Sequence, residues 1–315
     1  MARYMLKRIA GVLVTAVVVL VIAFFLIRLI PGDPAGVALG PEATPERINE
    51  FREQMGLNQP LPVQFGIFVG RLLHGDFGTS IFFRQPVSQV ILSRVETTFW
   101  LTCAALLVTL LIGVPLGVIA AVKRGTWIDQ LLLLAALVGV SLPSFWLGLL
   151  LILLFAVDLR WLPSSGFPSV FLTGQIANLR YIILPAVTLG VAECALLARL
   201  TRSSMLDVLR TDYITTARAK GLKESRIIIK HGLRNAAIPI VTVIGFTIAK
   251  LFAGAVVTET VFALPGIGRL AIEAILSRDY PVIQALMVVV ALTYLVFNLL
   301  TDLVYAVIDP RVSYR

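Results

Sequence analysis

Six long apolar stretches run through the 315-residue sequence and limit what it can fold into. Each exceeds the roughly 20 apolar residues that cross the hydrocarbon core of a bilayer as a helix. A helix suits such a stretch because it satisfies its own backbone hydrogen bonds where no water is present. The sequence therefore predicts an all-α integral membrane protein with six transmembrane helices, at residues 9–30, 99–122, 130–157, 181–203, 237–261 and 283–307.

Composition supports the membrane class. Hydrophobic residues make up 58% of the chain and charged residues 14%, and the mean hydropathy is +0.92. Soluble domains carry about 25% charged residues. A net charge of +9 is compatible with nucleic-acid binding, but the cations cluster at the ends of the apolar stretches rather than on one polar domain. We therefore expect membrane lipid around the chain and no nucleic-acid partner.

The placement of Lys and Arg predicts the orientation. Cations follow the rule that Lys and Arg collect on the cytoplasmic side of a membrane protein. They stand before the first apolar stretch, at Lys123 and Arg124 after the second, and from 199 to 234, where nine Lys and Arg outnumber three acids. With six crossings these groups fall on one side, so both termini are predicted to be cytoplasmic. The first apolar stretch is longer than the about 7–15 residues of a signal peptide and is expected to remain as an uncleaved helix.

Residues 1–98 are predicted to hold the first transmembrane helix and an external amphipathic segment, and residues 99–315 a five-helix core. In the external segment Thr44 is placed to cap a helix with Pro45 in its first position. Ile48, Phe51 and Met55 then share one face, with Gly56 closing the helix. Packing against the rest of the chain is the simplest use of that face; the membrane surface and an external partner are alternatives.

The most organised polar feature is the basic loop at about 204–236. It reads as two short helices with a corner at Gly221, because glycine readily adopts the left-handed conformation that ends a helix. Arg218 and Lys220 fall in the last turn of the first helix, where cations oppose the negative end of the helix dipole. The second helix is expected over 222–235. Charge alone also fits an ordinary cytoplasmic loop.

The spacing within this loop resembles the EAA loop of ABC-importer permeases, in its peptide-transporter form. Thr215 and Arg234 depart from the general motif, in which Glu and Pro are common at these places. The stretches at 29–34, 59–62, 74–78, 259–268 and 309–311 are similar to the same branch, except that Leu264 replaces a common aromatic. The loop residues that carry the resemblance are Tyr213, Ala217, Arg218, Ala219, Lys220, Gly221, Leu222, His231, Leu233, Arg234, Asn235, Ala236 and Pro239.

The resemblance implies a six-helix type I ABC importer permease, the first of two in its system, in a bacterial plasma (inner) membrane. It implies three kinds of partner: a second homologous permease, two cytoplasmic ATPase subunits that bind the ATP, and an external solute-binding protein. Substrates in this branch are dipeptides, oligopeptides, glutathione or nickel chelates. The loop would be the coupling helix that docks on an ATPase, through Ala217, Arg218, Ala219, Lys220, Gly221, Leu222, His231 and Arg234.

Two ionisable residues, Glu193 and Lys250, fall inside predicted transmembrane helices. A lone charge there costs at least about 2.5 kcal/mol, so we predict that they form an ion pair. Two alternatives stay open: charges that line a pathway and meet substrate, or neutral protonation states favoured by burial.

Motifs for catalysis and for nucleotide binding are missing from the sequence. It contains no G-x-x-x-x-G-K-[ST] phosphate loop and no G-x-S-x-G nucleophile elbow, and its two histidines, His74 and His231, are predicted on opposite faces of the membrane. We expect no enzyme, no cofactor and no metal site. The alternative functions are an ion-gradient-driven secondary transporter with Glu193 as its proton-linked carboxylate, and a membrane scaffold or sensor.

Overall fold

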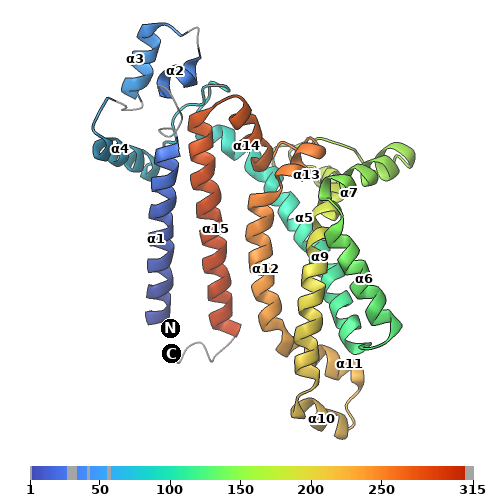
Figure 1. Cartoon of the computed structure of the whole chain (residues 1–315). Helices are drawn as coiled ribbons and strands as arrows, with labels where there is room; N and C mark the ends of the chain where they lie inside the picture. Colours follow the sequence, from blue (N-terminus) through green and yellow to red (C-terminus); the bar gives the residue numbers. More distant parts are fainter. Residues whose placement is uncertain (1, 27–33, 41–42, 55–57, 309–315) are drawn as a thin grey trace.

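The structure is a computed structural model and describes residues 2–26, 34–40, 43–54 and 58–308. The described residues are helical apart from turns and one isolated bridge between Thr79 and Pro86. Five long helices stand roughly side by side (Figure 1): α1 (Ala2–Leu26), α5 (Val87–Val122), α9 (Arg180–Leu209), α12 (Arg234–Gly254) and α15 (Tyr280–Ile308).

The third apolar stretch is a bent pair of helices. α6 (Trp127–Ser141) is followed after Leu142 and Pro143 by α7 (Ser144–Leu151), which continues as the π-helix η2 (Ile152–Asp158). The two arms are bent by 97°. Pro115 and Pro143 predict bends in the second and third apolar stretches, because proline cannot donate a backbone hydrogen bond and disfavours the helical conformation of the residue before it. The bend at Pro143 is confirmed. In the second stretch, α5 continues through Pro115 as one helix.

Among the described residues, four helices are long and apolar enough to cross a membrane, and the bent pair makes a fifth. They are α1, α5, α9 with the 3-10 turn η3 (Ile176–Leu179) before it, and α15. In α12 the apolar portion that stands out is shorter, at Val243–Phe252. The all-α membrane fold is therefore established, while the number of six crossings stays a prediction.

Glycines let α5 and α9 pack closely. A Cβ on Gly117 would lie 2.5 Å from Thr201 Cβ, and a Cβ on Gly190 would lie 2.6 Å from Val108 Cγ1. Small residues of this kind allow helix backbones to approach in a membrane. Gly113 and Gly117 stand four residues apart in the sequence, a spacing that predicts close helix packing. This prediction is confirmed, since a Cβ on Gly113 would come within 3.2 Å of Leu197.

Three short helices precede α5: α2 (Pro34–Leu39), α3 (Pro45–Gln54) and α4 (Leu61–Leu73). α3 starts where predicted, and the Arg47 N–H donates to Thr44 Oγ1 at 3.4 Å. Met55 and Gly56 lie outside the described residues. α4 packs near the end of α1, where the rings of Phe24 and Phe65 meet edge to face at 5.2 Å.

The remaining short helices form the end of the molecule opposite the basic loop (Figure 1). They are α8 (Val170–Thr173), α13 (Val256–Val261) and α14 (Ile267–Leu276). The sequence predicts both cysteines as buried small side chains without a disulfide. Both are free, but only Cys194 is buried, whereas Cys103 on α5 is exposed.

Candidate functional site

The basic loop forms a short helical hairpin at one end of the bundle (Figure 1). α10 (Asp212–Ala219) is followed by a corner at Gly221, then by α11 (Glu224–Arg226) and the π-helix η4 (Ile227–Leu233), which runs directly into α12. Gly221 has φ +76°, and its N–H donates to the Arg218 carbonyl at 2.9 Å. The helix therefore ends at Gly221 as predicted, through a left-handed residue.

The second half of the loop differs from the prediction of one regular helix over 222–235. It begins at Glu224 and is wound as a π-helix over Ile227–Leu233. Gly232 sits against α9 there, since a Cβ at this position would lie 3.0 Å from Met205 Cε. The apolar pattern predicts a helix but cannot show how many residues each turn holds, because contacts with α9 decide it.

A small apolar cluster holds the hairpin together. Ile214 and Ile227 are fully buried and Ala217 is 8% exposed, and Leu209 and Leu222 pack against them. Ala217 is thus small because it packs inside the hairpin, whereas Ala219 and Gly221 are exposed. This divides the predicted coupling residues into an inner set and an outer set.

Polar contacts close the two ends of the hairpin. Near the corner, Arg218 Nε lies 2.7 Å from Glu224 Oε1, so Arg218 pairs across Gly221 instead of reaching the free carbonyls of its own helix. At the base, Asn235 Nδ2 donates to Tyr213 Oη and to the His231 carbonyl, both at 2.8 Å. Tyr213 Oη also donates to that carbonyl at 3.3 Å. Sequence reasoning missed this clamp, because its partners are up to 22 residues apart.

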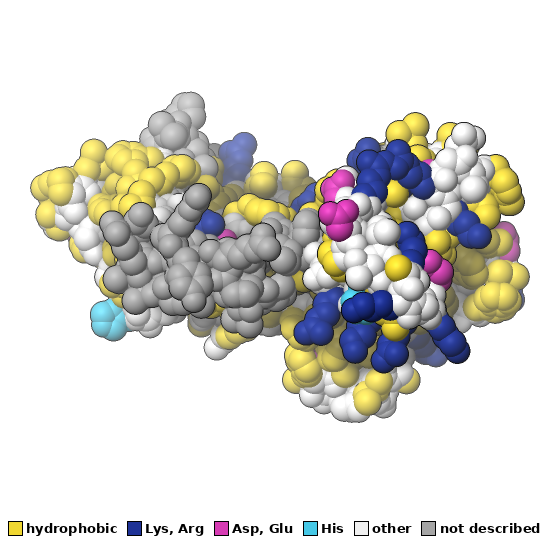
Figure 2. All heavy atoms as spheres, turned by 90° about the horizontal axis from the view of Figure 1, so that it is seen from below, with side chains coloured by type: hydrophobic (Ala, Val, Ile, Leu, Met, Phe, Trp, Pro, Cys, Tyr) yellow, Lys and Arg dark blue, Asp and Glu magenta, His cyan; other side chains and the backbone are white. Residues whose placement is uncertain are grey.

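The outer surface of the hairpin is basic. Figure 2 shows Lys and Arg side chains gathered over this end of the molecule. Beside them, the ends of α5 and α9 and the hairpin enclose a polar hollow of about 240 Å³, lined by Arg124, Arg210, Arg218 and Glu224. His231 and Leu222 are half-buried. The exposed residues of the hairpin include Arg218, Ala219, Lys220, Gly221, Lys223, Arg226, Ile229, Lys230 and Arg234, together with the acids Asp212 and Glu224.

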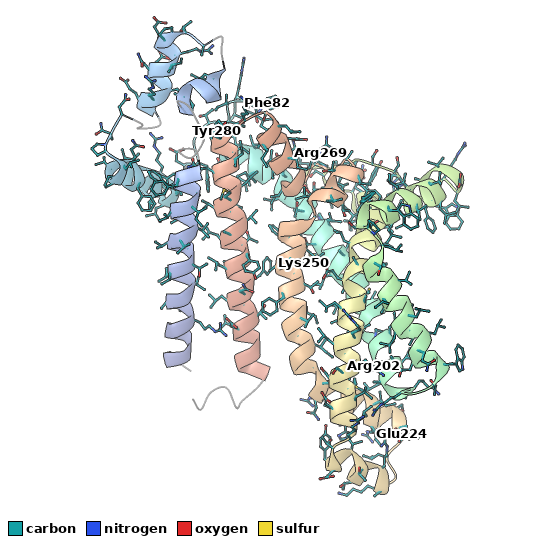
Figure 3. All side chains as sticks on the ribbon, viewed as in Figure 1. Phe82, Arg202, Glu224, Lys250, Arg269 and Tyr280 are labelled. Atoms are coloured by element: carbon teal, nitrogen blue, oxygen red, sulfur yellow. The ribbon has the colours of Figure 1, made fainter. Side chains whose placement is uncertain are left out.

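The structure brings Glu193 and Lys250 together. Lys250 Nζ of α12 lies 2.6 Å from Glu193 Oε1 of α9. The two ends differ in exposure: the Glu193 side chain is 9% exposed and the Lys250 side chain 69% exposed. In Figure 3 Lys250 stands partway along the bundle, between Arg202 near the basic hairpin and Tyr280 at the opposite end.

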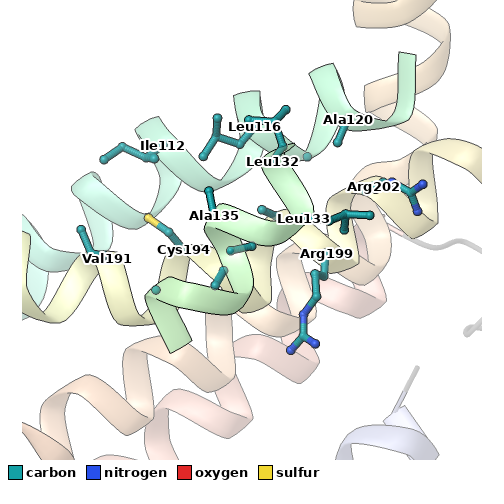
Figure 4. Close-up of a pocket in the computed structure, with 15 residues that line it drawn as sticks. Ile112, Leu116, Ala120, Leu132, Leu133, Ala135, Val191, Cys194, Arg199 and Arg202 are labelled. Carbon is teal, nitrogen blue, oxygen red and sulfur yellow. The ribbon is translucent and has the colours of Figure 1, made fainter. Parts of the chain in front are cut away.

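A second ion pair, which the sequence did not single out, joins α6 to α9. Arg202 Nε and Nη2 each lie 2.7 Å from one carboxylate oxygen of Asp129. Arg202 lines an apolar hollow of about 120 Å³ between α5, α6 and α9, together with Cys194 and Leu133 (Figure 4).

Carboxylates of the opposite end were also missed. Glu259, fully buried, accepts hydrogen bonds from Thr98 Oγ1 at 2.7 Å and from the Arg269 N–H at 2.9 Å. Asp279, also fully buried, accepts from the Ser80 hydroxyl and the Phe82 N–H. The partners of Asp279 lie almost 200 residues away, so no local pattern announces them. Both carboxylates fix loops in place rather than assemble a reactive site.

Among the described residues no group of three or more His, Cys, Asp or Glu side chains is placed to hold a metal ion. What the geometry offers is mechanical: a clamped basic hairpin continuous with α9 and α12, and an ion pair that joins those same two helices farther along.

Comparison with known proteins identifies the family. Residues 113–314 match the family model of the binding-protein-dependent transport system inner membrane component, and residues 1–102 match the model of its N-terminal region. The chain is 45% identical to the glutathione transport system permease protein GsiC of Salmonella paratyphi A and 43% identical to that of Escherichia coli K12. Both matches cover the whole of each chain.

The fold also matches a solved structure. A chain of the MetNI methionine ABC transporter, in an inward-facing conformation, superposes with a TM-score of 0.57 at 20% identity, over 70% of this chain and 97% of that chain. At this identity the likeness concerns the fold alone. Together with the full-length relatives it places the chain in a transport family rather than an enzyme family: it belongs to the binding-protein-dependent transport system inner membrane components and is a permease of an ABC importer.

Proposed function

We propose that this permease imports glutathione or a closely related small peptide, as the first of two permeases in its transporter. The proposed substrate is inferred from the full-length similarity of this chain to permeases named for glutathione transport. Nickel chelates and longer peptides are the alternatives that the sequence resemblance leaves open.

The proposed partners are a second homologous permease, two cytoplasmic ATPase subunits and an external solute-binding protein. ATP would be bound by the ATPases, because the chain has no phosphate-binding loop of the G-x-x-x-x-G-K-[ST] type. Membrane lipid would cover the remaining apolar surface.

The hairpin at Gly221 is the proposed contact with an ATPase. Its exposed corner presents backbone without a side chain, and its outer surface is basic. Its interior is packed and its two ends are clamped, so a force applied at the corner reaches α9 and α12 rather than being lost in a flexible loop. Alternating access would follow from movement of these two helices.

The orientation follows from the same hairpin. Arg8 of α1 lies 3.1 Å from Asp302 of α15, so the start of α1 and the end of α15 are adjacent. They lie toward the end of the bundle that carries the hairpin (Figure 1). If the hairpin meets a cytoplasmic ATPase, both termini are cytoplasmic, as the distribution of Lys and Arg predicts.

Transport by the purified transporter tests this proposal. The permease is expressed with its neighbouring transport subunits, purified as a complex and placed in liposomes with the binding protein. We expect ATP-dependent accumulation of labelled glutathione that vanadate abolishes. Uptake that ignores vanadate and stops when a proton gradient is dissipated at constant ATP would instead favour the secondary-transporter alternative.

One structural observation disfavours that alternative. A proton-linked carboxylate must exchange protons with water during transport. The Glu193 side chain is 9% exposed, and its Oε1 accepts a hydrogen bond from Lys250 Nζ at 2.6 Å.

A further inference from the structure

The two members of the intramembrane ion pair are placed unequally. Glu193 is enclosed by the helices of this chain, while most of the Lys250 side chain is open on the surface of α12. We propose that Lys250 binds a carboxylate group of the transported peptide, and that Glu193 is the positioning residue that holds its ammonium in place. This inference rests on the proposed function and adds the chemical class of substrate that the pathway accepts.

One side of α12, which carries Lys250, is not covered by the other helices of this chain. Phe246 is 52% exposed and precedes Lys250 by four residues, so the two side chains share one face of α12. The other sides of α12 pack against α9 and α15. Hydrocarbon against this face would surround an ammonium partway through the bilayer, which membrane proteins avoid. The face is therefore covered by protein and water, as a pathway between two permeases provides.

The Lys250 ammonium can donate more hydrogen bonds than the one that Glu193 accepts. An ammonium carries three N–H donors and no acceptor. Within the described part of the chain, Glu193 Oε1 accepts one of them. The remaining donors belong to the exposed end of the pair, so a substrate meets positive charge and donors there and the carboxylate lies behind.

The remaining donors of Lys250 determine which chemical group can bind there. Donors without acceptors bind an anion, and a charge-assisted hydrogen bond to a carboxylate is stronger than one to a neutral group. The exposed end of the pair therefore fits a free carboxylate of a peptide, which can accept the remaining Lys250 donors. The pair also lies on the two helices that leave the basic hairpin, so a movement of the hairpin that separates α9 from α12 would change the strength of the site.

The experiment uses the whole transporter in liposomes and compares uptake with ATP hydrolysis. Lys250→Met alone would leave Glu193 buried and unpaired, so the informative variant is the double change Glu193→Gln with Lys250→Met. We expect it to assemble and to keep ATP hydrolysis stimulated by the binding protein within about twofold. Glutathione uptake should fall by about tenfold or more, as expected on losing a charged hydrogen bond. Lys250→Arg should keep most of the uptake.

Wild-type uptake by the double variant would overturn the proposal and leave the pair a purely structural contact. Absence of ATP-dependent uptake in the unmodified transporter would instead refute the proposed function, and so is a separate result.

If the double variant does not assemble, cysteine labelling tests whether the exposed face of α12 lines the pathway. Phe246→Cys leaves the pair intact and is made in a Cys103→Ala background. A membrane-impermeant thiol reagent should modify it in the assembled transporter, with glutathione left out because its own thiol would consume the reagent. Val18→Cys on α1, where Val18 is 50% exposed, is the matched control and should stay unmodified in the bilayer. Failure to modify Phe246→Cys in the assembled transporter would mean that this face is not a pathway and would overturn the proposal.

Discussion

Replacing Gly221 tests the coupling hairpin at the point where structure and proposed function meet. Its φ of +76° is a left-handed conformation that costs a residue with a Cβ roughly 1–2 kcal/mol. Valine is a poor fit because its branched side chain is rarely found there. No described heavy atom lies within 4 Å of the point where a Cβ would stand, so the cost is backbone strain and not a collision inside the hairpin.

The size of this strain can be set against what holds the corner. The exposed ion pair between Arg218 and Glu224 contributes at most about 1 kcal/mol. A strain of roughly 1–2 kcal/mol shifts the balance between closed and open corner by about 5- to 30-fold. The transmembrane helices are distant from it and should insert normally. We therefore expect Gly221→Val to reach the membrane at the wild-type level and to lose most ATP-dependent uptake.

Three substitutions separate strain from docking. Asparagine tolerates the left-handed conformation better than alanine, and alanine better than valine. If strain alone matters, uptake should fall in the order Asn, Ala, Val. If the ATPase needs bare backbone at the corner, Gly221→Asn should be uncoupled as well, with ATP hydrolysis continuing while uptake stops. The measurements are permease content of the membranes, ATP hydrolysis and glutathione uptake in liposomes. Normal uptake by Gly221→Val would refute the coupling role.

Two predictions concern stability and are measured by thermal unfolding of the detergent-solubilised transporter. Gly117→Val should destabilise the protein by about 1–3 kcal/mol or more through overpacking against Thr201. The control Gly11→Val on α1 should be nearly neutral, because no described atom lies within 4 Å of the added Cβ. Equal effects of the two changes would contradict the close contact of α5 and α9. Arg202→Ala should lower the free energy of unfolding by roughly 3–5 kcal/mol, because it leaves the buried Asp129 unpaired. Adding Asp129→Leu should recover much of this loss. A double variant as unstable as the single one would show that the lost stability does not come from the unpaired carboxylate.

The features that the sequence predicts are those encoded by neighbouring residues. Apolar stretches long enough for a bilayer mark the long helices because lipid excludes unpaired backbone, whatever the tertiary structure. Gly221 marks the corner because the left-handed conformation is a local property. The ends of the helices are less predictable: α5 begins at Val87 instead of near 99, because a helix continues into the polar region wherever packing supports it.

The features that could not be predicted depend on residues far apart in the chain. Whether Arg218 meets its own helix end or Glu224 depends on how the corner folds. Asp279 binds a turn that is almost 200 residues away, and Glu259 binds α5 at a distance of 161 residues. Glu193 and Lys250 were suspected from the cost of a lone charge, yet their unequal exposure follows only from the packing of α9 and α12.

That inequality bears on how the hairpin and the pathway would work together. α9 and α12 are joined directly at the hairpin, through a packed cluster and the Tyr213–Asn235 clamp, and again at the Glu193–Lys250 pair. A buried carboxylate that lost its ammonium would be left uncompensated, which is costly in a membrane. Separating the two helices at the pair is therefore unfavourable unless another group replaces one partner. A substrate carboxylate cannot neutralise Glu193, so it would share the Lys250 ammonium with Glu193 and would not displace it. Movement of α9 relative to α12 would then weaken the binding of the substrate.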